Sequence, residues 1–357
     1  MLNHLNTSEI TNTCVEPNNN YPNEIKNKFL TNDFEIFLSE LKSLYNISAD
    51  RRNFNDIIKL LQTVNLNLQN DNGYTVLMLM CKINNTNTHI INILILSGAN
   101  LNLQNDNGQT ALMLLCEHNN TEEKIELLIK NGADLNLRNN DGQTALMILC
   151  KSFADPYSYQ YAKTKMIKKL IKSNADLNMV NNDGFTALMI AYECITNPES
   201  KLLTLLIKSN VNLDYQNNSG DSILMMVLYD FKKQEMFYME IIELIIKSGI
   251  NLNLQNNDNY SALMISYIFG EKSVTKLLID TGADLNLQDN DGNSLLMMIV
   301  KDNCDDNDSY HTEMIKLLIK LGADLNLKDT NDMTALMISR MNNNVDVTTL
   351  LMLAEQI

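Results

Sequence analysis

The chain has 357 residues, of which 45% are hydrophobic, and its formal net charge is −15. This length and apolar content suffice for a large core, whereas so acidic a surface repels the phosphates of nucleic acids and the headgroups of anionic membranes. No stretch reaches the roughly 18 apolar residues of a membrane-spanning helix, and the N-terminus lacks the basic and apolar segments of a signal peptide. We therefore expect an intracellular protein, cytoplasmic rather than nuclear, that binds neither nucleic acid nor membrane.

The first 70 residues differ from the rest of the chain. Residues 1–30 are polar, rich in Asn and contain two of the four prolines, a composition that favours a disordered or loosely attached segment. Residues 31–70 contain two helix-like stretches, DFEIFLSELKSLY and NFNDIIKLLQ, followed by VNLNLQN. Because this order is a weaker form of the unit that recurs after it, we expect a degenerate N-terminal capping repeat there.

From residue 71 onward, one motif recurs through the chain. NDNGQTALMLLC at 105–116 returns as NNDGQTALMILC at 139–150 and as NNDGFTALMIAY at 181–192. Its anchor position is glycine in most copies, and the shortest interval, from 259 to 292, is 33 residues. The anchors are Gly73, Gly108, Gly142, Gly184, Gly220, Asn259, Gly292 and Asp332. Longer intervals indicate insertions into a common unit.

A second motif alternates with the first, as in KMIKKLIKSNADLNMVN and SVTKLLIDTGADLNLQD. In the unit that begins at Asn107, Thr110 is placed to cap a first helix through its hydroxyl, and apolar residues follow it at three- to four-residue spacing. Gly132 suits the left-handed conformation that ends a second helix. The pattern therefore predicts two helices per unit and a short hairpin finger between units.

The alternating motifs resemble the ankyrin repeat, in which T-P-L-H opens the first helix and G-A-D-L-N follows the second. The resemblance covers roughly residues 31–357 and implies an all-α repeat solenoid of ankyrin helix–turn–helix repeats with short β-hairpin fingers. It implies seven repeats with inserts at 71–330 and a C-terminal capping repeat at 331–357. The Asn-, Ile- and Lys-rich composition further resembles the ankyrin-repeat proteins of large DNA viruses with AT-rich genomes.

The sequence departs from the ankyrin pattern where methionine replaces the histidine of T-P-L-H. In the family that histidine links neighbouring repeats by hydrogen bonds, so we expect the methionines to link them by packing instead. They are Met78, Met113, Met147, Met189, Met225, Met264, Met297 and Met337.

The sequence lacks the residue patterns of catalysis and of cofactor binding. Its histidines share no repeat register and have no partner at metal-ligand spacing, and its glycines form no phosphate-binding loop. The histidines are His4, His89, His118 and His311. Cys81, Cys116 and Cys150 recur at one register, but neighbouring repeats lie roughly 10 Å apart, too far to share a metal ion. We expect no enzyme, no cofactor and no metal site, and three buried core cysteines.

An ankyrin array implies a protein–protein interaction module or scaffold that binds a folded partner with its concave face and finger tips. We expect such a protein to be a monomer. The alternative is a substrate-receptor or regulatory subunit of a host-directed ubiquitin ligase or of another enzyme complex. Residues 1–30 contain no recognisable F-box, which argues against the ubiquitin-ligase role.

Within each unit the residue directly after the anchor varies most, so the fold does not dictate its type. It is Tyr74, Gln109, Gln143, Phe185, Asp221, Tyr260, Asn293 and Met333 in successive units. Tyr74, Phe185 and Tyr260 would be the aromatic anchors of an interface. The alternative is that this surface position varies because no function constrains it.

Two insertions carry clusters of aromatic residues, one at 152–163 and one at 229–239. They either contact a partner or extend helices and pack locally. The first insertion is expected to hold its aromatic residues in one loop. These are Phe153, Tyr157, Tyr159 and Tyr161.

The resemblance also implies a modification. An asparaginyl hydroxylase modifies ankyrin repeats at the finger asparagine of L-x5-D-[VIL]-N. The asparagines that match this pattern are Asn136, Asn178, Asn286 and Asn326. The alternative is that D-L-N only stabilises the finger, because an Asn side chain readily forms hydrogen bonds with the nearby backbone.

Overall fold

The structure, a computed structural model, describes residues 61, 65–83, 87–118, 122–152, 160–194, 201–230, 235–302 and 309–355. The expected disordered segment at 1–30 and nearly all of the expected capping repeat at 31–70 lie outside these residues. Within them, inner and outer helices alternate along the chain. The inner helices are α4 (Val76–Lys82), α6 (Ala111–Glu117), α8 (Ala145–Lys151), α10 (Ala187–Cys194), α12 (Ile223–Asp230), α14 (Ala262–Ile268), α16 (Leu295–Asp302) and α18 (Ala335–Met341). The outer helices are α5 (Thr88–Leu96), α7 (Glu122–Lys130), α9 (Gln160–Lys172), α11 (Lys201–Ile207), α13 (Glu235–Lys247), α15 (Lys272–Asp280), α17 (Ser309–Lys320) and α19 (Val345–Ala354).

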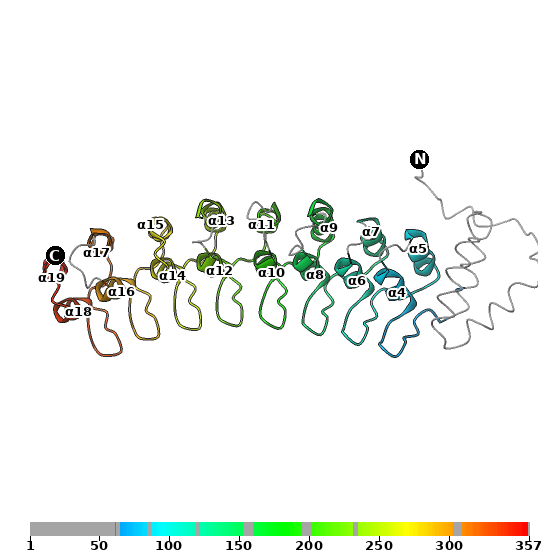
Figure 1. Ribbon diagram of the computed structural model, residues 1–357, viewed down its shortest axis with the longest axis horizontal. Coiled ribbons are helices and arrows are strands. Elements are labelled where there is room, and N and C mark those ends of the chain that lie inside the picture. Colours follow the sequence, from blue (N-terminus) through cyan, green and yellow to red (C-terminus); the bar gives the residue numbers. More distant parts are fainter. Residues whose placement is uncertain are drawn as a thin grey trace, which may run out of the picture.

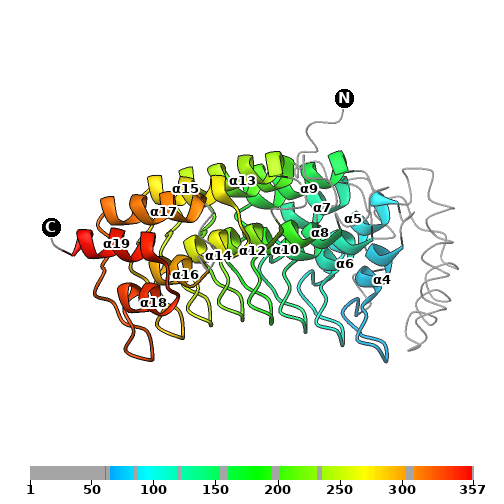
Figure 2. The same cartoon turned by 60° about the vertical axis from the view of Figure 1, so that its left-hand side comes forward.

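The helices form two stacked rows, and the chain runs back and forth between them. Figure 1 shows the outer helices in one row, the inner helices in the second row, and hairpin loops, the fingers, projecting from the inner row. The rows bend so that the fingers lie on the concave side, and Figure 2 shows the same two layers from another direction. Each inner helix packs on its own outer helix and on neighbouring inner helices, as α6 does on α4, α7 and α8. This is the predicted solenoid of helix–turn–helix units.

Each inner helix begins at the predicted Thr or Ser cap. The cap hydroxyl accepts a hydrogen bond from the backbone N–H three residues later, at 3.3–3.5 Å, which satisfies an open donor of the first helical turn. The caps are Thr75, Thr110, Thr144, Thr186, Ser222, Ser261, Ser294 and Thr334. The donor is the methionine of the motif. In two repeats, the sulfurs of Met78 and Met113 accept the N–H of their cap residues in return, at 3.4 and 3.5 Å, so these methionines also form hydrogen bonds.

Most residues of the inner helices from α4 to α16 are buried, whereas the outer helices bury one stripe. All residues from Ala111 to Cys116 of α6 are at most 2% exposed, because α6 lies between two inner helices and its outer helix. On α7 the buried stripe includes Ile125 and Leu128, both 0% exposed. The motif methionines from α4 to α16 are at most 1% exposed, which confirms that they link repeats by packing.

Cys81, Cys116 and Cys150 are buried in this core, as predicted. Burial raises the pKa of the Cys81 and Cys116 thiols to about 12, and it raises the pKa of Cys150 as well. These thiols are therefore neutral and poorly reactive at neutral pH. Among the residues that the structure describes, no group of three His, Cys, Asp or Glu side chains is arranged to hold a metal ion.

An Asn or Asp at the base of each finger shapes the turn of that finger. The side-chain Oδ1 accepts the backbone N–H groups two and four residues later, at 2.7–3.1 Å. The finger bases are Asn70, Asn105, Asn139, Asn181, Asn217, Asn256, Asp289 and Asp329. The anchor residue that follows has a φ between 59° and 80° in every described finger, the left-handed region that glycine adopts most readily. Isolated antiparallel bridges close several fingers, for example between Val180 and Thr186, in agreement with the predicted hairpins.

A hydrogen-bond ladder joins the fingers of successive repeats. Along the described fingers, a backbone N–H donates to a carbonyl of the preceding finger at 2.9–3.3 Å, as Asn140 does to Asn107 at 3.0 Å. Gln104 adds two bonds from one Nε2, to Gly108 O in its own finger at 2.6 Å and to Arg138 O in the next finger at 2.8 Å. The fingers approach so closely that a Cβ at Gly108 would lie 2.8 Å from Asn140 N. Glycine at an anchor such as Gly108 therefore avoids crowding between fingers as well as taking the left-handed conformation, whereas Asn259 places its side chain in a hydrogen bond with Asn290 Oδ1 at 2.7 Å.

Candidate protein-binding surface

Two positions of each repeat meet on the finger side of the inner helix: the residue after the anchor, and the residue eight positions later at the helix end. In the repeat of α6, Gln109 Nε2 donates to Glu117 Oε2 at 2.9 Å. The same pairing recurs between Tyr229 OH and Asp221 Oδ1 at 2.8 Å, between Lys301 Nζ and Asn293 Oδ1 at 2.5 Å, and between the Lys82 ammonium and the Tyr74 ring centroid at 5.0 Å. The two positions thus form two adjacent columns that run from repeat to repeat.

We call these two columns the concave strip. Its first column is the variable position already identified in the sequence, from Tyr74 to Met333. Its second column consists of Lys82, Glu117, Lys151, Glu193, Tyr229, Ile268, Lys301 and Met341. Every member of the second column except Lys301 is exposed, whereas the first column is half-buried or buried. The second column therefore offers most of the surface that a partner can touch.

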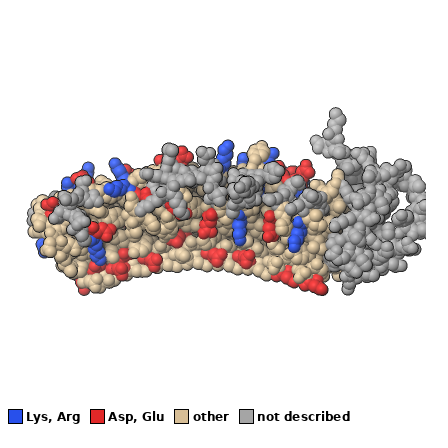
Figure 3. Space-filling model, viewed as in Figure 1, with Lys and Arg blue, Asp and Glu red and all other residues tan. Residues whose placement is uncertain are grey.

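The N-terminal half of the concave strip carries charges of alternating sign. Lys82, Glu117, Lys151 and Glu193 follow one another in successive repeats, and all four are exposed. Figure 3 shows this alternation of blue and red along the inner helices. Burial, followed by the nearby Asp183 carboxylate, raises the pKa of Glu193. A cation supplied by a partner at this point would therefore be favoured.

In the C-terminal half of the strip, the second column is apolar except for Lys301. Tyr229, Ile268 and Met341 are 38%, 51% and 71% exposed. The Phe269 ring contacts the Tyr229 ring edge-on, with 5.5 Å between centroids, so the aromatic surface continues into the next repeat. An exposed apolar group of this kind next to charged residues is typical of a protein interface.

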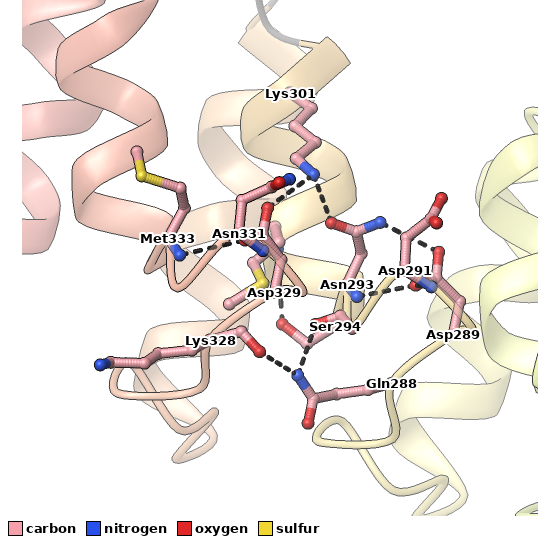
Figure 4. Close-up of polar contacts among 12 residues, drawn as sticks. Gln288, Asp289, Asp291, Asn293, Ser294, Lys301, Lys328, Asp329, Asn331 and Met333 are labelled. Atoms are coloured by element: carbon pink, nitrogen blue, oxygen red, sulfur yellow. Dashed lines mark hydrogen bonds and ion pairs between the residues drawn. The ribbon is translucent and has the colours of Figure 1, made fainter.

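Lys301 ties this end of the strip to the finger that follows (Figure 4). Its Nζ lies between Asn293 Oδ1, at 2.5 Å, and Asp329 Oδ2, at 3.1 Å. Asp329 is buried, and its Oδ1 also accepts the N–H groups of Asn331 and Met333. Burial alone would raise the pKa of Asp329, but the bonds from Met333 and Lys301 outweigh burial and lower it. The carboxylate is therefore ionised at neutral pH.

The aromatic residues predicted from the sequence to anchor an interface lie on the strip but do not meet. Tyr74, Phe185 and Tyr260 are half-buried against the core, in repeats separated by others. Burial, followed by neighbouring aspartates, raises the pKa of Tyr260. Ile268, which is more exposed, was not predicted, and Tyr229 was predicted only as part of the aromatic insertion at 229–239. The signal that could have found them is the eight-residue spacing, which returns to the same side of a helix after about two turns.

Only part of the first aromatic insertion can be placed. Phe153, Tyr157 and Tyr159 lie outside the described residues. The expectation that Tyr161 belongs to a loop is wrong, because α9 begins at Gln160 and contains it. Its side chain is 76% exposed, and the Lys165 ammonium lies 4.9 Å from the ring centroid. This part of the insertion therefore extends the outer helix.

The asparagines of the D-L-N motif hold successive repeats together. The Oδ1 atoms of Asn136, Asn178 and Asn286 accept a backbone N–H from the equivalent turn of the next repeat, at 2.9, 2.8 and 2.8 Å. Asn326 makes the same bond as the others to the Asp two residues before it, at 2.9 Å, but the described residues include no equivalent turn after α19 that could bond to it. The motif thus has a structural role, and its hydroxylation stays a prediction.

Comparison with known families agrees with this geometry. A model of three consecutive ankyrin repeats matches residues 80–155 and 234–307, and a model of one ankyrin repeat matches residues 291–330. No curated protein matches the chain. Within the described part of the chain, no helix combines the length and the apolar character needed to cross a bilayer. Ankyrin repeats generally serve as protein–protein interaction modules, and the chain that carries them here folds as an ankyrin-repeat solenoid.

Proposed function

We propose that this protein binds a folded protein partner through the concave strip and the adjoining finger tips. The observation that carries the proposal is the exposure of Tyr229 and Ile268 on neighbouring repeats, at a position that the fold leaves open. Aromatic and large aliphatic side chains contribute most of the binding energy in protein interfaces. The partner would bury these two residues first.

The charged half of the strip would select the partner and set its orientation. Lys82 and Lys151 alternate with Glu117 and Glu193, so a matching surface needs charges of the opposite order. Complementary charges of this kind mainly improve specificity and the rate of association. A uniformly basic or uniformly acidic surface would meet repulsion at every second repeat.

The finger tips add a row of acidic groups beside the strip. They include Asp71, Asp106, Asp141, Asp183 and Asp258, all of which are exposed. Figure 3 shows acidic side chains along the finger edge of the array. A partner that lies in the concave side would therefore carry basic residues at the edge that faces the fingers.

Comparative affinity capture from the cell of origin tests the proposal. The strip variant is Ile268→Lys, and the matched control is Leu321→Lys, because Ile268 ends α14, Leu321 directly follows α17, and the two are 51% and 50% exposed. The variant should lose captured proteins that the wild type and the control retain. Retention of every captured protein by Ile268→Lys would place the interface elsewhere. Ubiquitin-ligase subunits among the captured proteins would favour the alternative role of a substrate receptor.

A further inference from the structure

Four charged residues of the concave strip stand at one register in four successive repeats. Each is the seventh residue after the Thr that caps its inner helix, and each is exposed. They are Lys82, Glu117, Lys151 and Glu193. Their inner helices α4, α6, α8 and α10 pack side by side, and packed helices lie about 10 Å apart. The sign of the charge along the strip therefore changes about every 10 Å, in the row of blue and red groups that Figure 3 shows.

The protein does not neutralise these charges itself. Among the residues that the structure describes, none of the four forms an ion pair, although their signs alternate from repeat to repeat. Glu117 accepts a hydrogen bond from the neutral amide of Gln109 at 2.9 Å. The Lys82 ammonium lies 5.0 Å from the Tyr74 ring centroid. These contacts hold the charged groups in place and leave their charge for a partner to compensate.

An α-helix that lies across the repeats has the period that meets all four charges. It rises about 1.5 Å per residue, so seven residues advance about 10.5 Å and complete nearly two turns. Residues at seven-residue intervals therefore lie on one side of the helix, and their spacing matches that of the repeats.

A β-strand does not have this property. It rises about 3.3 Å per residue, so three residues advance about 10 Å, but residues three apart point to opposite sides of the strand. One side of the strand would therefore reach only every second repeat. Because the lysines and the glutamates each recur in every second repeat, that side would meet charges of one sign only. The alternation of charge thus favours a helix over a strand.

We propose that an α-helix of the partner lies along this half of the concave strip and carries four charges of alternating sign at seven-residue intervals. Its acidic residues would face the two lysines of this half, and its basic residues would face the two glutamates. The contacting segment would have about 22 residues and a length of about 33 Å. The inference rests on the proposed function, which makes the strip an interface, and adds the form of the partner and its pattern of charge.

Binding of synthetic helices to the purified full chain tests the inference. Fluorescence anisotropy measures the affinity at low salt, where exposed charges are screened least. The probes are cross-linked helical peptides of about 22 residues, mostly Ala and Gln, with Glu and Lys alternating at seven-residue intervals. They are made in both charge orders, because the helix can lie in either direction along the strip. One of the two orders should bind.

Two control peptides separate the charge pattern from the helix. The first has the same composition but places both Glu residues before both Lys residues. It should bind about tenfold more weakly, because two of its four charges would meet like charges on the strip. The second keeps the alternating pattern but lacks the cross-link and contains prolines that prevent a helix, so it should lose binding.

Variants of the chain locate the contact. Glu117→Lys/Glu193→Lys makes the charges of this half uniformly basic, so it should lose the alternating peptide and bind a helix with four Glu residues instead. The matched control Glu123→Lys/Glu240→Lys makes the same change of charge at exposed glutamates of the outer helices α7 and α13, and it should bind as the wild type does. All the substituted side chains are exposed, so both variants should fold, which circular dichroism checks.

Several results would overturn the inference. They are equal binding of the alternating peptide and either control peptide, no binding of either alternating peptide, or unchanged binding by Glu117→Lys/Glu193→Lys. A failure of this inference differs from a failure of the proposed function. Loss of captured proteins by Ile268→Lys, together with equal binding of all peptides, would keep the strip as an interface and reject the helix. Retention of every captured protein by Ile268→Lys, together with no peptide binding, would reject both.

Discussion

Lys301 and Asp329 belong to neighbouring repeats, and their side chains form an ion pair of 3.1 Å between α16 and the last described finger. The Lys301 side chain is 39% exposed, whereas the Asp329 side chain is 3% exposed. Water therefore screens one partner while the other depends on its bonds within the protein. The pair should stabilise the packing of these two repeats, though less than a fully buried pair would.

Replacing Lys301 by Met should lower the free energy of unfolding by about 1–3 kcal/mol at neutral pH, because the buried carboxylate loses a charged donor. The matched control is Lys328→Met. Lys328 pairs with Asp332 at 3.5 Å, and both side chains are exposed, so the control should change stability little. Urea unfolding of the three proteins measures the difference. Equal midpoints for Lys301→Met and the wild type would contradict the role assigned to the pair.

The same pair predicts a pH dependence. The pKa of Asp329 is lowered in the folded protein, so its contribution is present above the ordinary carboxyl pKa of about 4 and is lost as the pH falls through the folded value. The stability difference between the wild type and Lys301→Met should therefore shrink as the pH is lowered below about 4. Unfolding curves across this range test it, and a difference that grows in acid would have the wrong sign.

Alanine substitutions at two glycines distinguish the cost of backbone strain from the cost of crowding between fingers. Gly108 and Gly132 have φ values of 72° and 90°, so alanine is strained at either position. A Cβ at Gly108 would also lie 2.8 Å from Asn140 N, whereas a Cβ at Gly132 meets nothing within 4 Å. Gly132→Ala should cost about 1–2 kcal/mol, and Gly108→Ala should cost more. Thermal melts compare them; equal losses would mean that the fingers separate without cost.

Met189 and Met337 occupy the same motif position but are 1% and 44% exposed. Met189→Ala should lower the free energy of unfolding by about 2–5 kcal/mol, because it opens a cavity between packed helices. Leu188→Ala, at a residue that is 2% exposed, should fall in the same range of about 2–5 kcal/mol. Met337→Ala should cost clearly less. A melt that Met189→Ala leaves unchanged would show that the assigned repeat register is incorrect.

Cysteine labelling should follow burial. Cys81, Cys116 and Cys150 are buried and neutral, whereas Cys194 is partly exposed. Alkylation at neutral pH, followed by peptide mass spectrometry, should modify Cys194 before these three, which should react only in denaturant. Burial also raises the pKa of Cys194, so its own reaction should be slow and should quicken at higher pH. Rapid labelling of Cys116 in the native state would reveal opening of the central repeats.

Hydroxylation, if the cell of origin has the enzyme, should favour Asn326. The Oδ1 atoms of Asn136, Asn178 and Asn286 accept bonds from the following repeat, so those turns must open before an enzyme can hold them. Asn326 is the last of these asparagines, and its Oδ1 accepts no such bond from another turn among the described residues. Mass spectrometry of the native protein should find the single-oxygen increase at Asn326 first. Its absence from all four asparagines would end the proposal.

Much of the fold could be predicted because its determinants are local. The Thr or Ser cap, the left-handed anchor and the Gly or Asn that ends the outer helix each act within a few residues, and each repeats along the chain. Asn174 and Asn210, for example, take φ values of 64° and 61° where other repeats use glycine. Repetition also made the buried register clear, since the same positions stay apolar in every unit.

The candidate surface was predicted only in part, because it depends on contacts that the sequence does not display. The variable position after the anchor was found, but Tyr74 and Tyr260 proved half-buried. Ile268, at the other end of the inner helix, is the more accessible residue. Likewise, nothing local distinguishes Met337 from the buried methionines. Its exposure follows from the lack of a packed neighbour among the described residues.

The finger ladder has a consequence for how the protein can change its length. Every rung uses the same groups: a backbone N–H, a carbonyl of the preceding finger, and an Asn or Asp that shapes the turn. If the gene segment for one unit were duplicated, the new finger could therefore form the same hydrogen bonds with the fingers on both sides. If one unit were deleted, the fingers of its two neighbours could form these bonds with each other. The array can grow or shorten by whole units while each remaining turn keeps its bonds. Each such step would add or remove one pair of residues from the concave strip and so change what the protein binds without redesigning its fold.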